Sequence, residues 1–296
     1  MMVRSTVFTA LRRTFSSCSR YFSFRKGMAS DHLGRTAENT RLEVISLATV
    51  IGIRDESKTV KSLSLKVQDE RLTFKSGQWV DMFIPGLETV GGFSMCSSPI
   101  KLKQEQVLDL AVKYSKHPPA YWVHTKCKEG DTVDIRVGGD FYFDPMYNNK
   151  DVDLLLIAGG VGINPLYSIV NEIVDINKGD YSNHNKFSGR VTLLYSAQTK
   201  KELIFQEQLS DIQENNENIR CQFHVTREDN LPIEITKIPI VGKRIDEDVL
   251  VQCFDWLRKS NTLVYICGPF TMLEDMENTL IKIGINETNI KYEKWW

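Results

Sequence analysis

The sequence predicts two domains in series, an antiparallel β-barrel followed by an α/β domain built on a parallel sheet. Short strand-like segments follow one another between residues 43 and 144, which is typical of an antiparallel barrel or sandwich. After residue 151, apolar strands alternate with helical patterns, which indicates βαβ units. We therefore place the barrel at 43–148 and the α/β domain at 149–296.

Five segments of the first region predict the strands of the barrel. Each is rich in β-branched and aromatic residues and is bounded by Gly, Pro, Asp or Lys. They are EVISLATVIGI at 43–53, KSLSLKV at 61–67, GQWVDMFIP at 77–85, LDLAVKY at 108–114 and DTVDIRV at 131–137.

The strands of the second region are continuously apolar, as expected where both faces of a sheet are covered. They are DLLLIAG at 153–159, RVTLLYSA at 190–197, IRCQFHVT at 219–226 and TLVYICG at 262–268. Helical patterns at about 165–177, 200–214, 246–258 and 271–283 supply the cover. Thr199 and Glu202 have the spacing of a capping box, which predicts the start of the second of these helices.

The first thirty residues differ from the rest of the chain. They contain six Arg or Lys residues, many Ser and no acidic residue, and apolar residues recur at every fourth position from Val3 to Phe15. This composition predicts a mitochondrial transit peptide at 1–22 followed by a flexible leader at 23–42, with a disordered basic tail as the alternative. N-terminal sequencing of the mature protein should find Ser23 first, and an intact start would contradict this.

The composition disfavours several classes of function. A formal net charge of −1 gives no reason to expect a nucleic-acid partner. No apolar run approaches the roughly 20 residues of a membrane-spanning helix. The six cysteines include no C-x-x-C pair, which argues against a zinc site or a Cys-ligated cluster, so we expect reduced thiols and no metal.

A glycine turn follows the first apolar strand of the second region, where ligands bind in parallel sheets. It contains Gly159, Gly160 and Gly162. Glycines accept positive φ and let a ligand approach the backbone, and Asn164 and Pro165 predict the N-cap and first residue of a helix. The free N–H groups and the positive dipole end at the start of a helix form a binding site for two linked phosphates. The spacing of the glycines is neither G-x-G-x-x-G nor that of a P-loop. The turn is therefore either a dinucleotide-binding site or a plain turn between a strand and a helix.

The fourth strand ends on a second turn at the same edge. Gly268 and Pro269 predict a tight turn there, and Cys267 is either a group in the ligand crevice or a buried thiol.

The motifs GGVGINP, YSAQTKKELIF and YICGPFTM resemble, at these separations, the pyridine-nucleotide domain of the ferredoxin–NADP reductase family. FKSGQWVDMFIPG and KEGDTVDIRVGGDFYF are similar to its barrel strands, and the resemblance covers about residues 43–296. It implies that the barrel carries FAD, or FMN, and that the second domain binds NAD, with NADP as the alternative.

The resemblance also implies roles for individual residues. Ser94 lies near flavin N5, and Cys267 lies beside the reacting carbon of the nicotinamide. Thr226 and Arg227 could bind the 2′-phosphate of NADP, whereas the neutral Gln198 favours NAD. Trp295 is either an aromatic residue near the flavin or part of the frayed end of an edge strand. The remaining cofactor-binding residues are Gly159, Gly160, Val161, Gly162, Ile163, Asn164, Pro165, Gly268 and Pro269 for the dinucleotide and Phe93 and Ser97 for the flavin.

The sequence departs from the flavin signature R-x-Y-S-x-x-S at residues 91–97. Gly91 replaces the arginine and Phe93 the tyrosine, and Ala120 replaces the serine of a second phosphate contact. A hydrogen bond to a charged group contributes roughly 1.5–3 kcal/mol. Two hypotheses follow. One is a flavin-dependent NAD(P)H oxidoreductase that passes a hydride from nicotinamide to FAD and electrons to a separate acceptor. The other is an NAD(P)-binding regulatory or assembly protein with weakened flavin binding.

Overall fold

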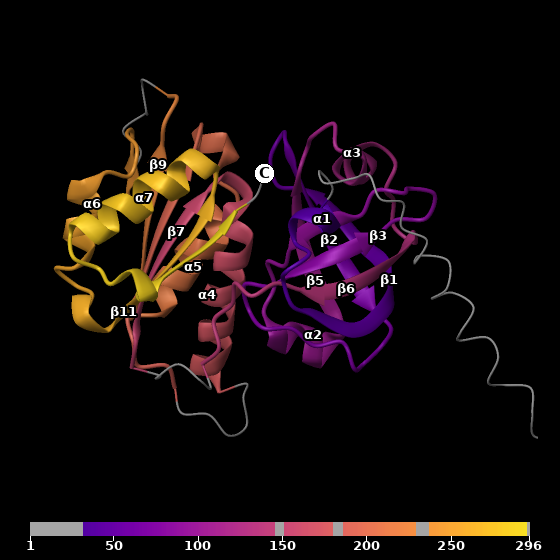
Figure 1. The fold of residues 1–296 in the computed structure, drawn as a ribbon, viewed down its shortest axis with the longest axis horizontal. Helices are drawn as coiled ribbons and strands as arrows, with labels where there is room; N and C mark the ends of the chain where they lie inside the picture. The colour runs from indigo at the N-terminus through magenta and orange to yellow at the C-terminus, as the bar shows by residue number, and fades with distance from the viewer. Residues whose placement is uncertain (1–31, 146–150, 180–185, 229–236, 295–296) are drawn as a thin grey trace, which may run out of the picture.

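The computed structural model describes residues 32–145, 151–179, 186–228 and 237–294. Two domains lie side by side, the barrel in indigo and magenta and the α/β domain in orange and yellow (Figure 1). The predicted boundary falls between the last barrel strand and the first strand of the second sheet, within residues 146–150, which are not described. The predicted transit peptide also lies outside the described residues.

The first sheet is an antiparallel barrel with the strand order β4-β3-β6-β1-β2-β5. A bridge between Met95 and Leu110 brings its two edges together, so the barrel is nearly closed. The five predicted strands are present, and β4 was missed because Gly91 and Gly92 are unusual in a strand. The strands are β1 Arg41–Asp55, β2 Val60–Val67, β3 Trp79–Phe83, β4 Gly91–Ser94, β5 Val107–Lys113 and β6 Thr132–Gly138.

Alternating side chains fill the barrel, as a period of two requires. Leu63 and Leu65 on β2 and Leu108 and Leu110 on β5 are fully buried. Two short helices, α2 Pro99–Glu105 and α3 Pro118–Thr125, lie on the barrel, and neither was predicted from the sequence.

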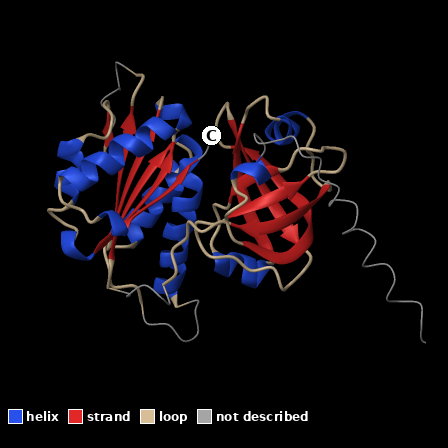
Figure 2. Ribbon diagram, viewed as in Figure 1, coloured by secondary structure: helices blue, strands red, loops and turns tan. Residues whose placement is uncertain are grey.

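The second sheet is parallel throughout, with the order β10-β9-β8-β7-β11-β12 and helices on both faces (Figure 2). Residues of β7 alternate between two cores, which explains its unbroken apolar sequence: Leu154 and Leu156 face one, Leu155 and Ile157 the other. The strands are β7 Asp153–Gly159, β8 Val191–Ala197, β9 Ile219–Val225, β10 Ile240–Val241, β11 Thr262–Gly268 and β12 Ile290–Lys294.

Four helices cover this sheet close to the predicted ranges: α4 Ile163–Lys178, α5 Gln206–Asn215, α6 Glu247–Cys253 and α7 Phe270–Lys282. The predicted capping box is wrong, because Thr199 makes no side-chain cap and only a 3-10 turn, Lys200–Glu202, follows it. Glu202 instead accepts a hydrogen bond of 2.5 Å from the Thr59 hydroxyl of the barrel. A contact between domains thus replaces a local cap.

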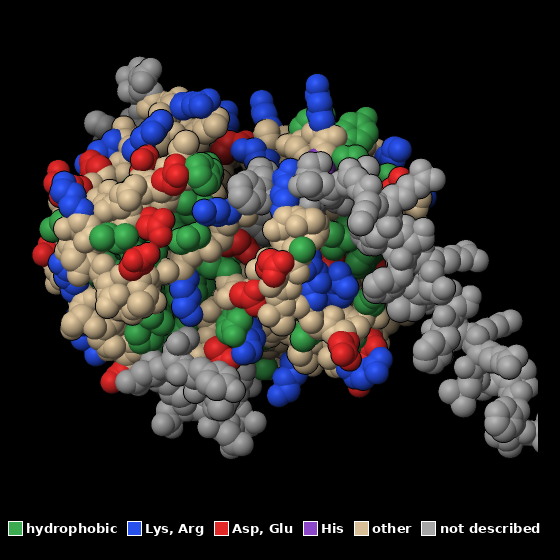
Figure 3. Space-filling view, in the orientation of Figure 1, with side chains coloured by type: hydrophobic (Ala, Val, Ile, Leu, Met, Phe, Trp, Pro, Cys, Tyr) green, Lys and Arg blue, Asp and Glu red, His purple; other side chains and the backbone are tan. Residues whose placement is uncertain are grey.

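Charged side chains of both signs are interspersed over both domains on the face drawn in Figure 3. Within the described ranges, no helix has the length and apolar character needed to cross a membrane.

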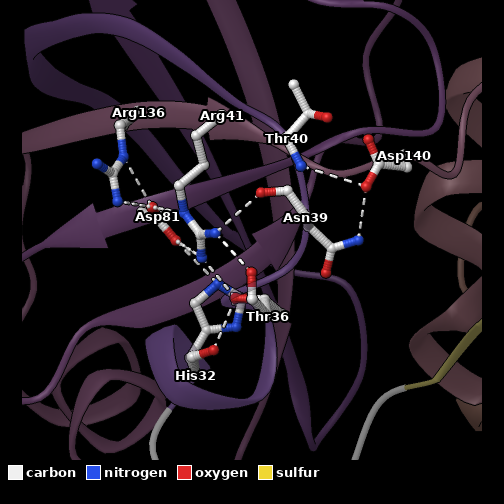
Figure 4. Close-up of polar contacts among 8 residues, drawn as sticks. All are labelled: His32, Thr36, Asn39, Thr40, Arg41, Asp81, Arg136 and Asp140. Atoms are coloured by element: carbon white, nitrogen blue, oxygen red, sulfur yellow. Dashed lines mark hydrogen bonds and ion pairs between the residues drawn. The ribbon is translucent and has the colours of Figure 1, made fainter.

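The N-terminal strap, residues 32–41, is folded onto the barrel, although the sequence analysis predicted a flexible leader there. It consists of α1 His32–Arg35 and the chain that leads into β1. Its anchor is Asp81, whose carboxylate is fully buried and contacts His32 at 3.0 Å and Arg41 at 2.8 Å (Figure 4). Arg136 adds a contact of 2.6 Å.

Burial alone would raise the pKa of the Asp81 carboxyl. The hydrogen bonds from His32, Arg41 and Arg136 outweigh burial and hold that pKa below its ordinary value. The stabilisation that this carboxylate provides is therefore complete above about pH 4 and is lost as the pH falls through the folded-state pKa.

We expect Asp81→Asn to lower the free energy of unfolding by about 2–4 kcal/mol at pH 7, because it leaves clustered cations without their counter-charge. The difference from the wild type should shrink below about pH 4. Urea unfolding at pH 7 and pH 3 measures both values. Asp55→Asn, which removes an exposed carboxylate 4.0 Å from Lys61, is the control and should change little. A loss that is the same at both pH values would contradict the ionic role of Asp81.

Candidate functional site

The sheet pocket, a cavity of about 340 Å³, opens at the carboxyl ends of β7, β8, β9 and β11. The strand order reverses between β7 and β11, and ligands of open α/β sheets bind at such a switch point. Of the predicted residues, Gly159, Gly160, Val161, Thr226, Arg227 and Pro269 line it.

The three glycines of the turn are required for different reasons. Gly160 alone has positive φ, +57°, and a Cβ there would enter open space. At Gly162 a Cβ would lie 2.2 Å from the carbonyl oxygen of Cys267, and at Gly159 it would lie 2.6 Å from the sulfur of Met272. Gly162 therefore lets the turn pack against the backbone of β11, Gly159 makes room for Met272 of α7, and Gly160 shapes the pocket.

Helix α4 begins at Ile163 with Gly162 as its N-cap, so the predicted caps at Asn164 and Pro165 are wrong. The 3-10 turn Gly160–Gly162 runs directly into the helix and moves its start forward. This frees the Asn164 side chain, whose Nδ2 donates to the carbonyl of Ala111 in the barrel at 2.7 Å.

The barrel pocket is a second cavity of about 340 Å³, lined mainly by residues of the barrel and closed at one end by the start of α4. Phe93 and Ser94 of β4 line it, as does Asn164. Lys113 and Val161 line both cavities, so the two pockets adjoin. The rest of its lining is His32, Arg35, Gly92, Ala111, Val112, Ser115, His117 and Ala120.

Ser94 and Cys267 are connected indirectly across the seam between the domains, because each is a neighbour of Glu293. The Ser94 hydroxyl donates to Glu293 Oε2 at 3.4 Å. Glu293 is the register partner of Cys267 across β12 and β11, and Cys267 is fully buried at the end of its strand. The barrel, β11 and β12 therefore each place one of these residues along the seam, where Ser94 lines the barrel pocket and Cys267 is buried outside the lining of both pockets.

A polar stripe on α4 holds the two domains together. Asn164, Ser168 and Asn171 lie on one helix face, and their side chains donate to the carbonyls of Ala111, Ser97 and Cys96 at 2.7, 2.6 and 3.1 Å. Figure 1 shows α4 between the sheet and the barrel. The sequence signal was polar residues at i, i+4 and i+7 within an apolar helix, which the sequence analysis did not use.

Other predicted residues lie elsewhere. Ser97 is buried in the barrel, where its hydroxyl accepts from the backbone N–H of Asp109 at 2.9 Å, and it does not line the barrel pocket. Ile163 and Pro165 are buried in the first turn of α4. Strand β12 is an edge strand of the sheet and ends at Lys294, and Trp295, for which the sequence leaves two interpretations, lies outside the described residues.

Sequence reasoning missed two positive groups of the pockets. Arg244 lines the sheet pocket, and Arg35 lines the barrel pocket. The buried His224 ring donates to the carbonyl of Lys243 at 3.1 Å, which fixes the chain next to Arg244. Burial lowers the pKa of His224, which favours the neutral imidazole. Both arginines come from irregular or short segments, which carry no motif.

Two observations fit cofactors in these pockets. The Asn164 Oδ1 atom is buried and has no hydrogen-bond partner among the described residues. Asn164 lines the barrel pocket, where a donor on a ligand would satisfy this oxygen. The open space above Gly160 lets a ligand contact the backbone at the start of α4. Among the described side chains, no group of three or more His, Cys, Asp or Glu residues could hold a metal ion.

Comparison with known proteins gives consistent matches. A model of the oxidoreductase NAD-binding domain matches residues 156–278. The oxidoreductase NAD-binding domain-containing protein 1 of Danio rerio is 46% identical over 269 residues, which are 90% of this chain and 98% of that protein.

Two solved structures share the arrangement of the domains. The cytochrome b5 reductase domain of Ulva prolifera nitrate reductase aligns with a TM-score of 0.67 at 19% identity, over 85% of this chain and 98% of that one. A ferredoxin NADP+ reductase from Neisseria gonorrhoeae with bound FAD and NADP aligns with a TM-score of 0.65 at 21% identity, over 84% and 98% of the two chains.

We expect Gly162→Ala to destabilise the protein by about 2 kcal/mol or more, because its methyl group would overlap the backbone of β11. Gly52→Ala is the matched control, since its Cβ would be 3.7 Å from the nearest atom, and it should change stability by less than about 0.5 kcal/mol. Chemical denaturation of both variants measures this. Equal stability of the two would mean that β7 and β11 can separate at little cost.

Proposed function

The chain belongs to the family of oxidoreductase NAD-binding domain-containing protein 1 and has the two-domain fold of the ferredoxin–NADP reductases, and on this basis we propose that it is a flavin-dependent NAD(P)H oxidoreductase. The nicotinamide dinucleotide would occupy the sheet pocket and the flavin, FAD in the first place, the barrel pocket. When bound, these cofactors supply hydride transfer from nicotinamide to flavin, and the electrons then pass to a separate acceptor.

One observation carries the proposal: the two pockets adjoin, since Lys113 and Val161 line both, and Ser94 of the barrel pocket is hydrogen-bonded to Glu293, the register partner of Cys267. Hydride transfer requires the two rings to lie against each other, so a binding protein with two independent sites would not need this junction.

The residues at the junction have separate tasks in this proposal. Ser94 presents a hydroxyl that is hydrogen-bonded to Glu293, and so its direction is set before a cofactor binds. Cys267 is fully buried and brings a small, polarisable side chain to the end of β11. The absence of a Cβ at Gly268 keeps this strand end close to Gly159, and the α4 stripe keeps the junction aligned.

The alternative function is an NAD(P)-binding regulatory or assembly protein with little catalytic activity. Gly91 and Ala120 favour it, because neither offers a side-chain donor to a flavin phosphate. The two proposals differ in whether the purified protein takes up flavin.

The oxidoreductase proposal predicts that the purified protein, with FAD added, shows the absorbance of a bound flavin and loses it when NADH is added without oxygen. Cys267→Ser should retain the flavin and slow this bleaching about tenfold or more, because the reacting rings lose their alignment. Stopped-flow absorbance measures the rate.

Cys253→Ser on α6 is the control, since this thiol is also buried but packs in the core on the other face of the sheet. Its bleaching rate should match that of the wild type. Protein that takes up no FAD at micromolar concentrations would refute the oxidoreductase proposal and favour the alternative.

The same measurement decides the nicotinamide cofactor. We propose NADH as the donor, because Gln198 lines the sheet pocket with its neutral side chain. NADPH is the second candidate, because Arg227 and Arg244 line that pocket as well and could pair with a 2′-phosphate. Faster bleaching by NADPH at equal concentration, abolished in Arg227→Ala, would favour the second candidate.

A further inference from the structure

Strand β4 brings no positively charged side chain to the barrel pocket. Position 91 has no side chain, and a Cβ there would lie 2.4 Å from the ring of Phe93 and 2.9 Å from Pro119. The space that a longer side chain would need is therefore closed by neighbours. Gly92, Phe93 and Ser94, which line the pocket from β4, are all uncharged.

The helix beside the pocket offers little compensation. Helix α3 begins with Pro118 and Pro119, and proline has no backbone N–H. Ala120 is thus the first helical residue that can donate from its backbone, and its side chain is a methyl group. A helix start attracts phosphate mainly through such free N–H groups, so this one is a weak anion site.

The positive charge of the pocket comes instead from side chains at its rim. Lys113, His117, His32 and Arg35 line it. Arg35 is an exposed guanidinium on the last residue of α1, and arginine is suited to phosphate because its donors match the oxygens in pairs.

The strap that carries Arg35 is fixed on both sides of this residue. On one side His32 contacts Asp81, and its ring packs edge-on against Trp79 at 4.7 Å. On the other side, Arg41 donates to the carbonyl of Thr36 at 2.6 Å, and Asn39 donates to Asp140 at 2.9 Å (Figure 4).

The barrel is shaped to receive the strap. A Cβ at Gly92 would lie 2.2 Å from the imidazole of His32, so this glycine of β4 makes room for the strap residue. The same strand continues to Phe93 and Ser94 in the pocket. The position of α1, and with it that of Arg35, is thus tied directly to the strand that forms the pocket wall.

We propose that Arg35, held by the N-terminal strap, binds the phosphate of the flavin in the barrel pocket. The inference rests on the proposed function, since it assigns a residue to the flavin of that same site. The recognised chemistry is a phosphate ester attached to the flavin side chain, which FMN offers once and FAD as a diphosphate, whereas riboflavin has none.

The test compares these three flavins. Binding is followed by the quenching of flavin fluorescence for the full mature chain and for Arg35→Ala, Arg35→Lys and Arg71→Ala. Arg35→Ala should weaken FAD binding at least about tenfold, the loss of a charge-assisted hydrogen bond. Arg35→Lys should give an intermediate loss, because the charge remains but the paired donors do not. Riboflavin binding should be the same in all four proteins.

Arg71→Ala is the matched control, because this exposed arginine pairs with Asp69 and lies outside the barrel pocket. Far-UV circular dichroism confirms that each variant is folded. A loss for both FMN and FAD places the contact at the phosphate next to the flavin side chain, and a loss for FAD alone places it at the adenosine side; either result supports the proposal.

Two failures are distinguishable. If wild-type protein binds FAD and Arg35→Ala binds it equally well, or loses riboflavin to the same extent, the role of Arg35 is overturned while the oxidoreductase proposal stands. If wild-type protein binds no flavin at all, the oxidoreductase proposal fails and the role of Arg35 fails with it.

Discussion

Helix α4 carries Asn164, Ser168 and Asn171 on the face that it turns toward the barrel, and each donates a hydrogen bond to a backbone carbonyl there. Buried carbonyls need partners, so these contacts make one arrangement of the two domains much more favourable than others. Both pockets depend on it, because the turn that leads into α4 lines the sheet pocket and Asn164 of α4 lines the barrel pocket. If α4 were apolar on this face, the two domains would lose the hydrogen bonds that favour this arrangement over others.

The second constraint is the close approach of β7 and β11. Gly159, Gly162 and Gly268 have no side chains where the two strand ends meet, and Gly160 turns the chain with positive φ. In consequence the end of β11, with Cys267, reaches the seam where Ser94 and Glu293 lie. Glycine content at this turn thus serves packing between strands as much as contact with a ligand.

In the barrel pocket, strong donors for a flavin phosphate are missing from β4 and α3, and Arg35 of the strap supplies a positive charge instead. Position 91 is filled by the ring of Phe93, and α3 begins with two prolines, so neither side chain nor backbone supplies strong donors. The strap, anchored on the buried Asp81, brings Arg35 to the same rim. Desolvating that carboxylate is costly, and its hydrogen bonds with His32, Arg41 and Arg136 offset the cost. The buried ion cluster and the charge of the pocket are therefore parts of one arrangement.

The sequence by itself determined the fold class, most strands and the glycine turn, because these follow from local periodicity and from backbone requirements at single residues. Only the tertiary structure decided what polar side chains do. Glu202 has the spacing of a helix cap but bonds to Thr59 of the barrel, and Asn164 resembles an N-cap but bonds to Ala111. Arg35 stood in a segment without pattern. Such partners are far apart in the chain, and local spacing carries no information about which distant carbonyl or carboxylate a side chain will meet.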